Sequence, residues 1–157
     1  MFFINYLSKN SIILYMENDL NDIKIEGNPD LTNYMREFKE DNTVTERNLR
    51  EKSLTCNSIR AKWVNYYYKE KDNLKRIKAK KEERLKNKLA SNPNKNSVLR
   101  MKSEDVLSQN DEVIQKLNIL NERVKENISF IEHAMNVLKD LGFTIKNTYD
   151  IIKMQTI

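Results

Sequence analysis

Glycine and proline are almost absent from this sequence, which contains only Gly27, Gly142, Pro29 and Pro93. Tight hairpins and phosphate-binding loops need glycine at defined positions, so neither kind of structure is expected here. Long stretches without either residue favour uninterrupted helices instead. The sequence therefore predicts an all-α fold.

Cysteine and histidine are equally scarce, with one of each, Cys56 and His133. A single cysteine cannot form an internal disulfide and is interpreted as a small buried apolar residue. A single histidine excludes a histidine-based catalytic triad or zinc site within one copy, and His133 is interpreted as a packing or surface residue. The carboxylates are scattered among basic residues. We therefore expect a protein that is not an enzyme and has no metal and no cofactor.

Long apolar runs are missing as well, since none approaches the roughly 20 residues that span a bilayer. A chain of 157 residues has room for one compact domain or two small ones. Apolar residues make up 39% of it, which is below the usual share in globular proteins. So limited a core favours completion by self-association. Residues 1–15 lack the features of a signal peptide. They are interpreted either as an upstream extension, with translation starting at Met16, or as a disordered N-terminal arm.

Helix signals are clear in the region 16–90. Asn28-Pro29-Asp30 predicts a helix start, followed by a short helix from Leu31 to Lys39. Thr43-Val44-Thr45-Glu46 fits a capping box, which predicts a long helix from about Val44 to Ala90. Its apolar positions recur at three- and four-residue steps, with Glu70 and Lys81 as interruptions: Cys56, Ile59, Trp63, Tyr67, Leu74, Ile77 and Leu85.

A polar linker at residues 91–102, around Pro93, separates this region from a C-terminal region, 103–157. There Ser103 is expected to cap a second long helix that ends at Gly142, and residues 143–157 form a short last helix that folds back or docks on another subunit. The apolar stripe of the second helix is close to heptad spacing, which predicts oligomerisation. The residues expected to mediate it are Leu117, Leu120, Val124, Ile128, Ile131, Met135 and Leu138.

Positive charge is concentrated in one segment. Between residues 62 and 88 there are eleven basic and four acidic residues, so this segment carries +7 while the whole chain carries +5. An ordinary solvated helix face is the alternative, but residues 75–81 contain no acid at all, which favours an anion-binding face. The candidate nucleic-acid-binding cations are Lys62, Lys75, Arg76, Lys78, Lys80, Lys81, Arg84, Lys86 and Lys88.

Four aromatic residues, Trp63, Tyr66, Tyr67 and Tyr68, stand at the start of the basic segment. Aromatic faces beside lysines suit stacked bases flanked by phosphates, and each stacked base contributes about 1–3 kcal/mol. Trp63 and Tyr67 fall on the apolar stripe and are expected in the core. Tyr66 and Tyr68 are therefore the candidates for base stacking, and the segment as a whole predicts binding of single-stranded nucleic acid.

Two blocks of residues resemble the UvsY family of phage recombination mediators, which are recombination, repair and single-stranded-DNA-binding proteins. The first block is Lys62-Trp63-Val64-Asn65, followed by the basic runs 76–81 and 85–89. The second is Val106-Leu107-Ser108 and, further on, the Gly-Phe-x-Ile-Lys segment within 141–147. Together the blocks span roughly residues 60–90 and 104–154. They are similar to the family in order and spacing, although the tyrosines that follow the second basic run in the family are missing here.

The resemblance implies a homo-oligomer, as a ring, that binds single-stranded DNA. It also implies partners, namely a RecA-like recombinase that the protein loads in place of single-strand-binding protein. The family's DNA contacts carry over to Lys86 and to Lys88, which stands where the family has arginine. Such a protein is expected in the cytoplasm, of the host cell if a phage encodes it, with no membrane partner.

Two other functions remain open from the residues alone. A coiled-coil scaffold would use the lysine run only to keep a long helix soluble, and would bind no DNA above background. An RNA-binding helical arm would place the same charges on duplex RNA and would prefer it to single strands.

Overall fold

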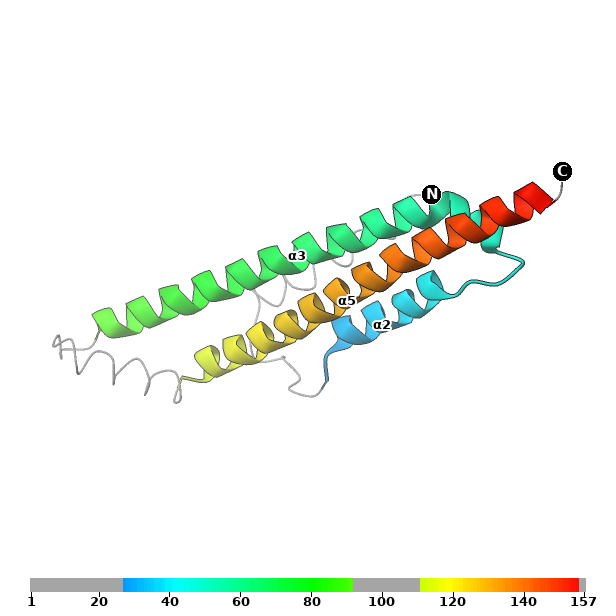
Figure 1. Cartoon of the computed structure of the whole chain (residues 1–157). Helices are drawn as coiled ribbons and strands as arrows, with labels where there is room; N and C mark the ends of the chain where they lie inside the picture. Colours follow the sequence, from blue (N-terminus) through cyan, green and yellow to red (C-terminus); the bar gives the residue numbers. More distant parts are fainter. Residues whose placement is uncertain (1–26, 92–110, 156–157) are drawn as a thin grey trace, which may run out of the picture. The chain divides into compact units, whose positions relative to one another are not determined.

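A computed structural model of the chain describes residues 27–91 and 111–155. These residues form three helices, α2 (Pro29–Asn42), α3 (Leu49–Ala90) and α5 (Glu112–Gln155), and no strand occurs among them (Figure 1). The all-α prediction is confirmed for this part of the chain. The expectations for residues 1–15, for most of the linker and for a cap at Ser103 lie outside the described residues.

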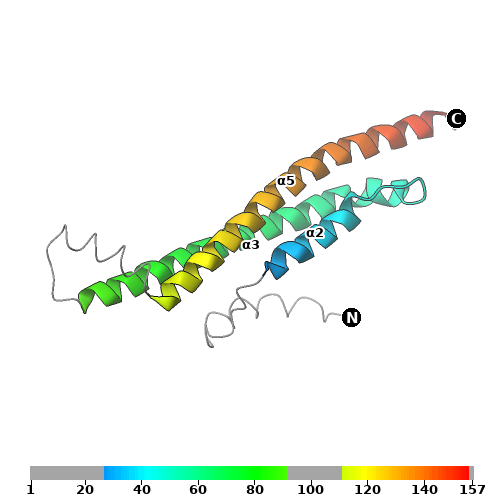
Figure 2. The same cartoon turned by 90° about the horizontal axis from the view of Figure 1, so that it is seen from below.

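The described part of the chain divides into two compact units. Of the described residues, unit 1 contains residues 27, 78–91 and 111–120, and unit 2 contains residues 28–77 and 121–155. Unit 2 contains α2, most of α3 and most of α5, and its helices lie side by side (Figure 2). Each unit thus combines residues from both of the regions that the sequence suggested.

Asn28 is the N-cap of α2, at the helix start that the sequence predicted. Its side-chain oxygen accepts a hydrogen bond from the N–H of Leu31 at 3.2 Å, and proline follows at the first helical position. The other half of the amide donates to the carbonyl of Arg123 at 3.3 Å and to Oδ1 of Asn127 at 3.0 Å. The cap therefore also attaches α2 to α5. The helix extends three residues past the predicted end, to Asn42.

The predicted start of the long helix at Val44 is wrong, because α3 begins at Leu49. The hydroxyl of Thr43 donates to the carbonyl of Lys39 at 2.6 Å and so serves the end of α2. The reciprocal box forms further on instead. The N–H of Thr45 donates to Oδ1 of Asn48 at 2.7 Å, and the N–H of Asn48 donates to the hydroxyl of Thr45 at 3.3 Å.

Trp63 is the centre of the core of unit 2, with none of its surface exposed. Its ring lies against Phe38 of α2 and Phe130 of α5, with centroid distances of 5.9 and 6.3 Å. Tyr34 and Tyr66 complete the aromatic cluster, and Ile131, Ala134 and Leu138 of α5 are buried against it. The prediction that Trp63 belongs to the core is confirmed, and half-buried Tyr67 packs on the same cluster.

Glu70, which interrupts the apolar stripe of α3, is fully buried. The hydroxyl of Tyr34 donates to one carboxylate oxygen at 2.8 Å, and the amide of Asn73 donates to the other at 3.3 Å. Hydrogen bonds to both carboxylate oxygens compensate for the cost of removing Glu70 from water. The pKa of Tyr34 is raised, first by burial and then by the charge of Glu70 and its hydrogen bond. This contact adds a polar link between α2 and α3.

The described part of α5 starts at Glu112, and Asp111 is its N-cap. One carboxylate oxygen of Asp111 accepts the N–H groups of Val113 at 2.9 Å and Ile114 at 3.2 Å. Ile114 and Leu117 follow on the buried face of the helix, with at most 4% of their surface exposed.

The predicted helix end at Gly142 is also wrong, because α5 continues without a break to Gln155. No short, separate C-terminal helix exists among the described residues. The positive φ that a left-handed cap would need occurs at Gly27 and not at Gly142. Continuation places Ile145 on the same face as Leu138 and Leu141, and Ile145 is buried there. This burial favours the helical path over a turn at the glycine.

Replacing Gly142 with alanine is expected to raise the free energy of unfolding by about 0.5–1 kcal/mol, because glycine is a poor residue inside a helix. A Cβ atom at this position meets nothing within 4 Å. Gly27→Ala is the control, since φ is +79° there and alanine would be strained. Urea denaturation followed by circular dichroism measures both variants. A loss of stability in Gly142→Ala would contradict the expectation.

Candidate nucleic-acid interface

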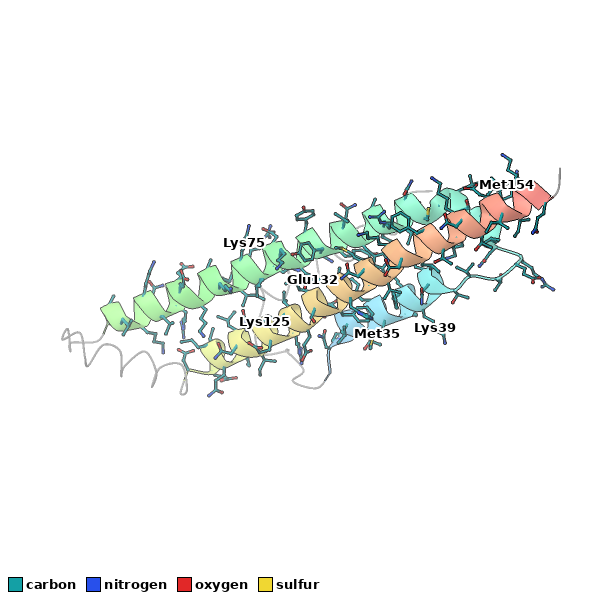
Figure 3. The ribbon with its side chains drawn as sticks, viewed as in Figure 1. Met35, Lys39, Lys75, Lys125, Glu132 and Met154 are labelled. Atoms are coloured by element: carbon teal, nitrogen blue, oxygen red, sulfur yellow. The ribbon has the colours of Figure 1, made fainter. Side chains whose placement is uncertain are left out.

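All nine predicted DNA-binding cations lie on α3, and the structure separates them by what they contact. Lys75, Lys78 and Lys86 have exposed side chains, and Figure 3 shows Lys75 projecting from the helix. Lys80 and Lys81 are half-buried. The remaining four, Lys62, Arg76, Arg84 and Lys88, are engaged in ion pairs.

Lys62 is held in a polar network where α2 meets α3. Its ammonium lies 2.6 Å from Asp41 and 3.3 Å from Glu37. The indole N–H of Trp63 donates to the same Asp41 oxygen at 2.7 Å, and the hydroxyl of Tyr66 donates to Glu37 at 2.9 Å. These contacts fix the two helices together. DNA binding by Lys62 stays a prediction, and it would have to compete with two carboxylates.

The two tyrosines proposed for stacking have different surroundings. The ring of Tyr66 packs edge-on against Trp63 at 5.7 Å within the core cluster. Burial, followed by the hydrogen bond to Glu37, raises the pKa of Tyr66 to about 12. Tyr68 is 67% exposed and touches Tyr67 edge-on at 5.7 Å. The exposure of Tyr68 is compatible with base stacking, which stays a prediction.

Half-buried Lys71 follows Tyr68 by three residues on α3 and is not among the nine predicted cations. Val64, Tyr68, Lys71 and Lys75 follow each other at steps of four, three and four residues, which places them along one face of the helix. The ammonium of Lys71 lies 5.0 Å from the centroid of the Tyr67 ring. The spacing from Tyr68 is the signal that would have identified Lys71.

Arg76 forms a surface pair with Asp72 one turn earlier, at 2.8 Å, and both side chains are more than half exposed. Such exposed pairs contribute only about 0–1 kcal/mol, so the ion pair opposes phosphate binding by Arg76 only weakly. DNA binding by Arg76 stays a prediction.

Arg84 and Lys88 converge on one carboxylate, that of Asp111 in unit 1. The ammonium of Lys88 is 3.0 Å and the guanidinium of Arg84 is 3.3 Å from the same oxygen. Burial acts to raise the pKa of Asp111, but the contacts with Lys88, the N–H of Ile114 and Arg84 outweigh it and hold the pKa below its ordinary value. The sequence signal for Asp111 was an acid directly before an apolar-periodic run.

The seven residues predicted for oligomerisation line the inner face of α5. Five of them are buried within the chain, namely Leu117, Val124, Ile128, Ile131 and Leu138, and Leu120 and Met135 are half-buried. Their role in self-association stays a prediction. Large apolar side chains that point outward near the end of α5 are Phe143, Ile151, Ile152 and Met154. By their spacing, Phe143, Ile151 and Met154 lie on one side of the helix.

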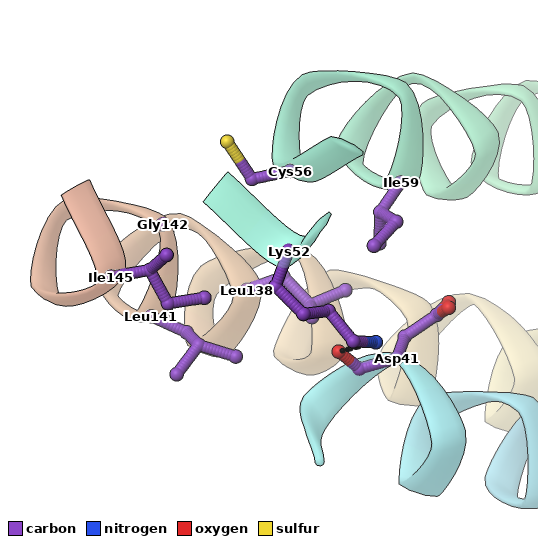
Figure 4. A pocket seen from close by; sticks show the side chains of 8 residues that line it. All are labelled: Asp41, Lys52, Cys56, Ile59, Leu138, Leu141, Gly142 and Ile145. Atoms are coloured by element: carbon purple, nitrogen blue, oxygen red, sulfur yellow. Dashed lines mark hydrogen bonds between the residues drawn. The ribbon is translucent and has the colours of Figure 1, made fainter. Parts of the chain in front are cut away.

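A small pocket in unit 2 lies between α3, the end of α2 and α5 (Figure 4). It is lined by Asp41, Lys52, Cys56, Ile59, Leu138, Leu141, Gly142 and Ile145. The ammonium of Lys52 donates to the carbonyls of Glu40 and Asp41 at 3.0 and 3.1 Å, which completes the C-terminal end of α2. The half-buried thiol of Cys56 donates to the carbonyl of Ser53 at 3.5 Å. The polar groups of the pocket therefore have structural roles.

Among residues 27–91 and 111–155, no group of three or more histidine, cysteine, aspartate or glutamate side chains is placed to hold a metal ion. In the same residues, no helix is long and apolar enough to cross a membrane.

Comparison with known proteins identifies the family. Residues 37–156 match the family described as "Recombination, repair and ssDNA binding protein UvsY". A crystal structure of the bacteriophage T4 recombination mediator protein UvsY, in lattice type IV, superposes with a TM-score of 0.65 and 25% sequence identity, covering 80% of this chain and 98% of that one. The lattice type II structure gives a TM-score of 0.64 at 21% identity, covering 81% and 98%. No curated protein sequence matched. The family match spans α3 and α5 with the whole candidate interface, and the chain therefore belongs to the UvsY family of recombination, repair and single-stranded-DNA-binding proteins.

Proposed function

We propose that this protein is a non-enzymatic recombination mediator that binds single-stranded DNA along α3. It promotes loading of a RecA-like recombinase onto the strand in place of single-strand-binding protein. The observation that carries this proposal is the exposure of Lys75, Lys78, Lys86 and Tyr68 on one helix, in a segment with a charge of +7. Lysine side chains bind phosphates without reading sequence, and an exposed tyrosine stacks on any base.

The exposed position of these groups suits a grip that must later be released. Each phosphate contact displaces a counterion. On single strands, the logarithm of the association constant therefore falls with the logarithm of the salt concentration, with a slope of about −0.7 for each contact. Three exposed lysines therefore contribute a slope of about −2 per copy. Exposed contacts are individually weak, so they exchange when a recombinase competes for the strand.

We also propose that copies of the chain assemble into a ring through α5. The seven heptad residues lie on the inner face of this helix. The exposed side chains of Phe143, Ile151 and Met154 provide an apolar surface on which a second copy can pack. A ring would place several copies of α3 on one flexible strand, which raises avidity without strengthening any single contact. Sedimentation analysis of the purified chain measures the assembly.

Titration of a fluorescent oligo-dT strand, followed by anisotropy at several salt concentrations, tests the proposed function. We expect salt-dependent binding in which single-stranded DNA outcompetes duplex DNA and duplex RNA. Recombinase filament assembly on a strand covered with single-strand-binding protein is the second measurement, and we expect it to speed up. Equal, feeble binding to every polyanion would leave a coiled-coil scaffold, and preference for duplex RNA would leave an RNA-binding arm.

A further inference from the structure

The carboxylate of Asp111 in unit 1 has every bonding position in use. One oxygen accepts the backbone N–H groups of Val113 and Ile114 at the start of α5. The other oxygen lies 3.3 Å from Nε and 3.3 Å from Nη2 of Arg84, and 3.0 Å from Nζ of Lys88. A guanidinium and an ammonium from successive turns of α3 thus meet at a single anionic oxygen.

A phosphate of the DNA backbone presents the same kind of group to these cations, an anionic oxygen that accepts charged hydrogen bonds. The side chains of Arg84 and Lys88 are 42% and 41% exposed, while that of Asp111 is only 4% exposed. Solvent can reach both cations, and so can a DNA strand, although the buried Asp111 carboxylate is already bound to them. The ionised Asp111 carboxylate reduces the charge of this cluster from +2, for Arg84 and Lys88 alone, to +1.

We propose that Asp111 competes with DNA phosphate for Arg84 and Lys88, and so weakens the grip of this part of α3 on single-stranded DNA. The inference rests on the proposed function, because it concerns the strength of the same interface. A phosphate must share or displace the Asp111 carboxylate, whereas at Lys75, Lys78 and Lys86 it meets exposed ammonium groups. Asp111 thereby keeps two cations of the basic segment 62–88 in an exchangeable state, which suits a protein that transfers the strand to another.

Asp111→Asn separates charge from capping, because asparagine is as good an N-cap as aspartate. The matched control is Glu112→Gln, which also raises the net charge from +5 to +6 and also breaks an ion pair, that of Glu112 with Lys116 at 2.7 Å. The side chain of Glu112 is 75% exposed and contacts neither Arg84 nor Lys88 in any ion pair of the described residues. Asp111→Ser, a second neutral cap, serves if the asparagine variant folds poorly.

We expect Asp111→Asn to bind oligo-dT about 3- to 10-fold more tightly than Glu112→Gln, measured by anisotropy. Freeing two cations should steepen the salt slope by up to about 1.4, at about 0.7 per contact. Equal affinities and slopes for the two variants would overturn the inference while leaving the proposed function in place. Weaker binding by both neutral caps would also overturn it, since Asp111 would then position the cations for DNA. Absence of oligo-dT binding by the wild type would refute the proposed function and this inference together.

Discussion

Replacing Trp63 with alanine is expected to lower the free energy of unfolding by about 3–5 kcal/mol, the range for a fully buried aromatic side chain. The ring contacts aromatic side chains from all three helices of unit 2, including Phe38 of α2 and Phe130 of α5. Its N–H also donates to Asp41 at 2.7 Å, so the substitution leaves that carboxylate with one partner fewer. This cost is a large share of the stability of a small domain. Urea denaturation followed by circular dichroism at 222 nm gives the difference.

Tyr68→Ala is the matched control for this experiment, since it removes an aromatic ring from the same helix five residues later. The ring of Tyr68 is 67% exposed and the surface of Trp63 is not exposed at all. We expect the control to change the free energy of unfolding by no more than about 0.5 kcal/mol. Similar losses in the two variants would show that the aromatic cluster does not hold unit 2 together.

The triple variant Lys75→Gln, Lys78→Gln, Lys86→Gln is expected to weaken binding to oligo-dT by about 10- to 100-fold. Each contact is counted at about 0.5–1 kcal/mol, the upper half of the range for exposed ion pairs, and every 1.4 kcal/mol is tenfold in affinity. The salt slope should fall in magnitude by about 2, because three counterion-releasing contacts are lost. All three side chains are exposed, so the fold should be unaffected.

A control triple on α5 removes the same charge from another helix. Lys139, Lys146 and Lys153 are exposed and seven residues apart, and their replacement with glutamine also takes the net charge from +5 to +2. If net charge alone governs DNA binding, the two triples will lose affinity equally, and the assignment of the interface to α3 fails. If α3 carries the interface, the control should keep most of its affinity and nearly its full salt slope.

Helix content could be read from the sequence because it depends on local properties. Long stretches without glycine or proline and a regular apolar spacing favour helix wherever the chain lies, and the start of α2 at Asn28 follows from a local cap. The predictions of a helix start at Val44 and a helix end at Gly142 were wrong for a different reason. Thr43 bonds back to α2, and Ile145 gains burial only if α5 continues, so both outcomes depend on neighbouring structure.

The sequence by itself determined the helical class, the placement of the positive charge on one helix and the burial of Trp63. Only the tertiary structure decided which charges and rings are available. It placed Tyr66 in the core and Tyr68 in solvent, and it paired Arg84 and Lys88 with Asp111, 27 and 23 residues away along the chain. Periodicity shows which face of a helix is apolar, because the repeat is local. The partner of a charged side chain depends on which other helix packs beside it, and that contact exists only in the folded chain.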